Sequence, residues 1–168
     1  MGISMRVLMM TDGQIQDLDQ DPSRLEDMLN GAELHAIEGH CHLTDSWGAL
    51  HYVLTGGVGE GELPLGAVMK GDVDLSKGLA DPAHAIYSAT ARALSRELLR
   101  LSEPTLQERF DPQKMFEARV SPHRGWAADC FSGIRFADLM QHFRRLQAFV
   151  AAAAEGGKGL VFYRFEDW

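Results

Sequence analysis

The chain has 168 residues, of which 45% are hydrophobic and 24% are charged, and its formal net charge is −8. This size and apolar content suit one domain with its own core, so we expect a single domain over residues 1–168. The negative charge disfavours nucleic acid and anionic membranes as partners, because both attract basic surfaces. Two cysteines, Cys41 and Cys130, are too few for a disulfide framework and fit a reducing compartment. With no secretory leader and no apolar stretch long enough to cross a bilayer, we expect a cytoplasmic protein.

The hydrophobic pattern predicts a strand at each end of the chain and helices between them. Residues 3–10 are apolar on both faces, so we expect a strand that is covered on both sides. Residues 160–165 are rich in aromatic and branched side chains and predict a terminal strand that pairs near the first one. A short helical turn should carry Ile15 and Leu18, and further helices are expected to begin near Pro22, Trp47, Ser88, Thr105, Pro112 and Arg135. We expect Ser88 to cap the helix that follows it. The fold class is therefore α+β, mostly helical with a small sheet that includes both terminal strands.

One segment carries a family resemblance. The run Trp47-Gly-Ala-Leu-His51-Tyr-Val-Leu-Thr55-Gly56, followed by Pro64-Leu65, resembles the signature of the YfbM-like family, a bacterial domain of unknown function (1877). The resemblance extends over the whole chain and implies an α+β fold, but no activity, cofactor or catalytic residue. Some relatives are encoded beside secreted toxins, which implies an immunity role for part of the family.

The densest collection of potential metal ligands is His35, His40, Cys41, His42 and His51. In an extended segment His40 and His42 would point the same way and could hold zinc from one side, while Cys41 would point away. The spacing matches no compact zinc module. We therefore expect ordinary loop histidines, no metal and no cofactor, and keep a zinc site as the alternative.

His51 is the best single candidate for acid–base chemistry, because an unperturbed imidazole titrates near neutrality. On a helix it lies one turn after Trp47 and close to Leu54. The sequence identifies no nucleophile or carboxylate partner, so we favour a packed core residue and a protein that is not an enzyme. The alternative is a small enzyme or ligand-binding domain with a pocket around Trp47 and His51.

The glycine-rich loop of residues 56–66 is not a phosphate loop. It lacks the lysine and the following serine or threonine that contact phosphate and magnesium, and Glu60 and Glu62 would repel phosphate. We expect a flexible surface loop without a nucleotide.

Negative charge is concentrated near the N-terminus. Between Thr11 and His40 there are eight acidic residues and one basic residue, Arg24, so this segment has a net charge of −7. A solvated helical face would explain the acids, but carboxylates on a rigid helix would also steer a basic partner into place. We expect a non-enzymatic binding protein, an immunity protein that neutralises a basic, nuclease-like toxin domain. The sequence indicates no oligomeric state. The predicted partner-binding residues are Asp17, Asp19, Asp21, Glu26 and Asp27.

Overall fold

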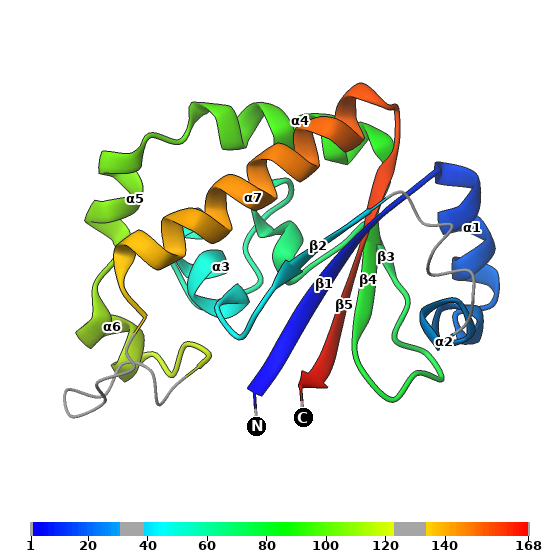
Figure 1. The fold of residues 1–168 in the computed structure, drawn as a ribbon, viewed down its shortest axis with the longest axis horizontal. Coiled ribbons are helices and arrows are strands. Elements are labelled where there is room, and N and C mark those ends of the chain that lie inside the picture. Colours follow the sequence, from blue (N-terminus) through cyan, green and yellow to red (C-terminus); the bar gives the residue numbers. More distant parts are fainter. Residues whose placement is uncertain (1, 31–38, 123–133, 168) are drawn as a thin grey trace.

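The two terminal strands lie side by side in the middle of an antiparallel sheet (Figure 1). The computed structural model describes residues 2–30, 39–122 and 134–167. Strand β1 (Gly2–Met10) pairs with β5 (Gly159–Asp167) along its whole length, from Gly2 opposite Asp167 to Met10 opposite Gly159. The predicted pairing of the chain ends is confirmed.

Three shorter strands complete the sheet within the described ranges. Strand β2 (His40–Leu43) pairs with the other edge of β1, β4 (Ala83–Ile86) pairs with β5, and β3 (Val73–Asp74) pairs with β4. The resulting order is β2-β1-β5-β4-β3, with antiparallel neighbours throughout. These three strands were not predicted, because they have two to four residues and β4 consists largely of alanine and histidine. With helices packed on this sheet, the α+β prediction is confirmed.

Helices α3 (Trp47–Thr55), α4 (Ser88–Arg100) and α7 (Phe136–Glu155) cover one face of the sheet (Figure 1). Alternation along the central strands turns Met5, Val7, Leu160 and Phe162 towards these helices. The helices contribute leucines and aromatic residues at helical spacing to the same buried cluster. This larger core lies between the sheet and the pair α4 and α7.

Helices α1 (Asp12–Gln20) and α2 (Ser23–Asn30) cover part of the opposite face. Leu8, Met10 and Val161 of the sheet pack there against Ile15 and Leu18 of α1 and Leu25 of α2. Strand β1 is therefore covered on both sides, as its two apolar faces predicted. The two helices stand at one end of the molecule in Figure 1.

The start of α4 differs from the prediction that Ser88 caps it. Ser88 lies inside the first turn of the helix, where its backbone amide and its hydroxyl donate to the two carboxylate oxygens of Asp12, each at 2.7 Å. A carboxylate from α1 thus satisfies a donor that the helix leaves unpaired. This contact joins the two layers on opposite sides of the sheet.

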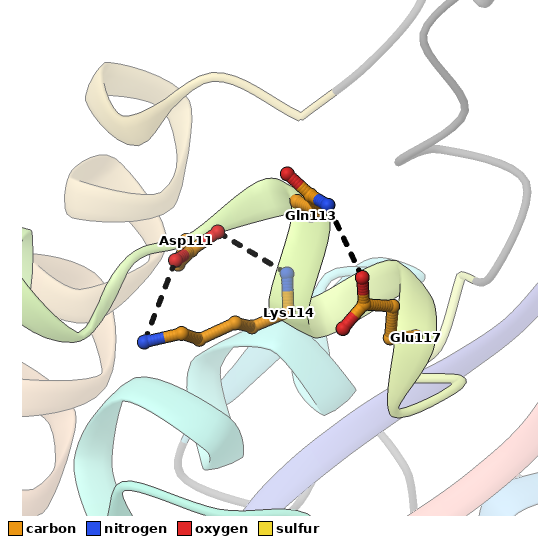
Figure 2. A network of polar contacts seen from close by, with 4 residues as sticks. All are labelled: Asp111, Gln113, Lys114 and Glu117. Carbon is orange, nitrogen blue, oxygen red and sulfur yellow. Dashed lines mark hydrogen bonds and ion pairs between the residues drawn. The ribbon is translucent and has the colours of Figure 1, made fainter.

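Helices α5 (Glu103–Arg109) and α6 (Pro112–Glu117) lie at the other end of the molecule from α1 and α2 (Figure 1). Figure 2 shows how α6 is held: the Asp111 carboxylate accepts the Lys114 amide at 3.1 Å, and the Lys114 ammonium lies 3.7 Å from the same carboxylate. Gln113 donates to Glu117 at 3.2 Å. Among the helices of the described ranges, none is long and apolar enough to span a membrane.

Candidate functional site

Two of the acids on α1 and α2 form hydrogen bonds to distant parts of the chain. Asp12 is hydrogen-bonded to Ser88, and Glu26, which is half-buried, accepts the backbone amide of Ala80 at 3.1 Å. Both carboxylates hold α1 and α2 to segments that are distant in the sequence. Of the predicted partner-binding residues, Glu26 therefore has a structural contact of its own.

The other four predicted residues are exposed. Asp17, Asp19, Asp21 and Asp27 all point to solvent, and every ion pair found within the described ranges lies elsewhere. Asp21 accepts the hydroxyl of Ser23 at 2.5 Å through one of its carboxylate oxygens. We call these four exposed carboxylates the acidic surface. Glu33 and Glu38, which share the negative segment, fall outside the described residues.

One tyrosine shows that acids from separate segments converge. Burial raises the pKa of Tyr87, and the charges of Asp19, Asp12 and Asp72 raise it further. Asp72 precedes β3, so the hairpin of β3 and β4 adds negative charge beside α1. The helices that carry these exposed acids bury their apolar sides, with Ile15 of α1 and Leu25 of α2 in the core.

His51 is sealed in the core, with 1% of its surface exposed. Its Nε2–H donates to the Gly59 carbonyl at 2.6 Å, and its Nδ1 has no partner among the described residues. Burial lowers the pKa of His51, while the bond to Gly59 opposes that shift. The imidazole is therefore neutral near pH 7 and closed off, as expected for a packed core residue, and it does not line the pocket beside Trp47.

The glycine-rich loop explains this burial. Gly56 ends α3 in the left-handed conformation, with φ of 79°, and the loop then folds back so that Gly59 meets His51. Gly66 could not carry a side chain, since a Cβ there would lie 2.6 Å from the Glu60 carbonyl oxygen. The loop thus touches α3 at His51, while most of residues 56–62 are exposed at the surface.

Trp47 does line a pocket, as the alternative interpretation expected. A pocket of about 250 Å³ is bordered by Trp47, Tyr52, Met69 and Val120, among others. The indole Nε1–H of Trp47 donates to the Ile3 carbonyl at 2.7 Å, which fixes the ring against β1. Only 6% of the surface of Trp47 is exposed.

The histidine–cysteine cluster lies in strand β2 and not in a loop, which corrects the loop prediction. His40 and His42 are exposed on one side of the strand and Cys41 is buried on the other, as an extended backbone requires. Burial raises the pKa of the Cys41 thiol to about 11, although Arg145 opposes this shift. Within the described ranges, no three histidine, cysteine or carboxylate side chains are placed to hold a metal ion. His35 and Cys130 fall outside these ranges.

Sequence reasoning missed a second cavity, of about 290 Å³, beside β3 and β4. Arg164, Lys70 and His84 line it. His84 is 7% exposed, stacks on Phe162 and donates its Nε2–H to the Ala67 carbonyl at 2.6 Å. Burial lowers the pKa of His84 to about 4, so the ring is neutral near pH 7. The only sequence signal for this cavity was that His84 and Arg164 are polar residues within otherwise apolar segments.

The protein is a small α+β protein. Its antiparallel sheet pairs the two chain ends, and helices pack on both faces of that sheet. The chain belongs to the family described as Domain of unknown function (DUF1877), whose model matches residues 1–163. The predicted YfbM-like membership is thereby confirmed. Among solved structures the chain is similar to the protein of unknown function YfbM from Escherichia coli, with a TM-score of 0.73 and 16% identity over 96% of this chain and 99% of that one. At this identity the likeness is one of fold. No protein with a curated description matches the sequence.

Proposed function

We propose that the chain is a non-enzymatic protein-binding domain that holds a basic partner on its acidic surface, and that the partner is a nuclease-like toxin domain whose activity it blocks. The observation that carries the proposal is that Asp17, Asp19, Asp21 and Asp27 are exposed and form no ion pair within the described ranges. Negative charge of this kind attracts a basic surface and raises the rate of association.

The support for a rigid surface comes from the packing beneath it. Ile15, Leu18 and Leu25 are buried against the sheet, and Asp12 and Glu26 tie the helices to Ser88 and Ala80. A surface that is ordered before binding loses less entropy in the complex. Nuclease clefts are basic because they bind phosphate backbones, so an acidic inhibitor surface is complementary to them.

The experiment compares two charge-matched triple variants in affinity capture of the product of the neighbouring gene. The first variant neutralises Asp17, Asp19 and Asp27 to asparagine and leaves the hydrogen-bonded Asp21 and Glu26 intact. The control replaces three glutamates by glutamine: Glu103, Glu108 and Glu117. These side chains are exposed on α5 and α6, at the opposite end of the molecule.

We expect capture by the wild type and by the control, and loss of capture by the first variant. Equal capture by all three proteins would show that the acidic surface does not bind the partner. No capture by any of them would show that the neighbouring gene product is not the partner. Inhibition of the captured protein's nuclease activity is the further requirement for an immunity role.

A ligand-binding domain remains the second candidate. The pocket beside Trp47 favours it, without a part for His51.

A further inference from the structure

The cavity beside β3 and β4 contains an arginine whose donors are unused. Arg164 on β5 is half-buried, and its Cζ lies 5.4 Å from the centroid of the Trp47 ring. Burial lowers the pKa of the Arg164 guanidinium. Within the described ranges the guanidinium forms no ion pair and no hydrogen bond. The contact with the ring holds the group in place but occupies none of its five N–H donors.

The guanidinium is thus open to an acceptor from a ligand, and an oxyanion is the acceptor that it can bind through two parallel hydrogen bonds. Lys70 supplies a second cation to the same cavity, and it too is half-buried and without an ion pair in the described part of the chain. His84 adds no charge near pH 7, because burial lowers its pKa to about 4 although the hydrogen bond to Ala67 opposes that shift. The less exposed charges of the cavity are therefore positive.

The acids of the cavity are more exposed. Glu60 and Asp74 both belong to its lining and both reach solvent, and Asp74 already accepts the amide of Ser76 at 2.9 Å. They would oppose a ligand with two or more negative charges, such as a phosphate dianion, more strongly than a ligand with one. This arrangement favours a monoanion.

An apolar space adjoins the cationic one. Met69 lines both this cavity and the Trp47 pocket, and the Trp47 ring lies beneath Arg164. The two spaces have volumes of about 290 and 250 Å³, which together suit a small organic molecule. A ligand anchored on Arg164 could place an apolar group along Met69.

We propose that this cavity binds a small monocarboxylate that carries an apolar or aromatic group, with the carboxylate on Arg164 and Lys70 and the apolar group against Met69 and Trp47. The site lies on the face of the sheet that carries Phe162, whereas α1 and α2, the helices beside the acidic surface, cover part of the opposite face. The proposal is independent of the toxin-binding function.

The test is an NMR titration of the whole chain, read from the side-chain Nε–H of Arg164 and the indole N–H of Trp47, with the indole signal assigned from Trp47→Phe. The probes are phenylacetate, its neutral amide phenylacetamide, acetate and inorganic phosphate. We expect saturable shifts with phenylacetate, weaker binding of acetate and phosphate, and no binding of phenylacetamide.

Three variants localise the effect. Arg164→Gln should weaken phenylacetate binding by about tenfold or more, and Lys70→Gln by a smaller factor, because each removes a charge-assisted contact. Arg24 is an exposed arginine on α2, and the Arg24→Gln variant should bind phenylacetate as the wild type does. If Arg164→Gln does not fold, the affinity of Lys70→Gln for phenylacetate and the comparison of the four probes test the proposal.

Equal binding of phenylacetamide and phenylacetate would overturn the proposal, as would tighter binding of phosphate than of phenylacetate. Unchanged affinity in the folded Arg164 variant, or in Lys70→Gln where the Arg164 variant does not fold, would also overturn it. So would the absence of shifts with every probe.

Discussion

Asp12 accepts two hydrogen bonds from Ser88, one from the backbone amide and one from the hydroxyl, each 2.7 Å long. The two residues are 76 positions apart in the chain, and their contact fixes α1 to the first turn of α4. Replacing Asp12 by alanine removes a helix cap and leaves two donors unpaired, so we predict a loss of about 2 kcal/mol in the free energy of unfolding. Urea unfolding measures it. Asp17→Ala on the exposed side of α1 is the control, and an equal effect of both substitutions would contradict the assignment.

Glu26 and Asp27 are neighbours in the sequence with different roles in the structure. Glu26 accepts the Ala80 amide, whereas Asp27 is exposed and has no described contact. We predict that Glu26→Ala lowers the free energy of unfolding by about 1 kcal/mol and that Asp27→Ala changes it by less than about 0.5 kcal/mol. Thermal unfolding of the two proteins checks this. A larger effect at Asp27 than at Glu26 would show that the Ala80 contact does not stabilise the fold.

His84 should make stability depend on pH. Its pKa is lowered to about 4 in the folded chain, so the unfolded chain binds more protons below the ordinary pKa of histidine, near 6.5. The stabilising contribution is complete above that value and is lost as the pH falls towards 4. Between about pH 7.5 and about pH 5 we predict a loss of about 2 kcal/mol from this group.

The measurement is urea unfolding at the two pH values for the wild type and for His84→Gln. His51, whose pKa is also lowered by burial, adds to the dependence in both proteins, so the difference between them isolates His84. Identical pH dependence of the two proteins would mean that His84 is not buried in its neutral form.

Arg109 on α5 closes the end of α3. Its Nη1 donates to the carbonyls of Val53 and Leu54, at 3.0 and 2.8 Å, and satisfies acceptors that the helix end leaves unpaired. We predict that Arg109→Met lowers the free energy of unfolding by about 2 kcal/mol, because bonds from a charged donor are lost. Arg100→Met is the matched control, since Arg100 is exposed and pairs only with Glu97 among the described residues. Equal losses in a chemical unfolding experiment would rule out a capping role for Arg109.

The sequence predicted those parts of the fold whose signal is local. The terminal strands and α7 followed from apolar periodicity over many residues. Strand β4 was missed because Ala-His-Ala-Ile is too short and too weakly apolar to show a period of two. Its pairing with β5 is decided by tertiary contacts, which a local pattern does not contain.

The site was harder to predict for the same reason. Charge counting found the acids of α1 and α2, but it could not separate Asp12 and Glu26, whose partners Ser88 and Ala80 lie far along the chain, from those that face solvent. The position of His51 on an apolar helix favoured burial, and the structure places it in the core. Arg164 gave only a weak sequence signal, as a charged residue in an apolar strand, and its contact with the Trp47 ring is a tertiary contact that a local pattern does not contain.

We propose that exposed carboxylates on α1 and α2 steer a basic partner into a complex. The most direct measurement is the association rate constant of the neighbouring gene product with the chain, followed by stopped-flow at low and high ionic strength. We predict that neutralising Asp17, Asp19 and Asp27 lowers the low-salt rate constant by about tenfold and flattens its salt dependence, while neutralising Glu103, Glu108 and Glu117 leaves both nearly unchanged. Equal rate constants and equal salt dependence for the two variants would contradict the claim.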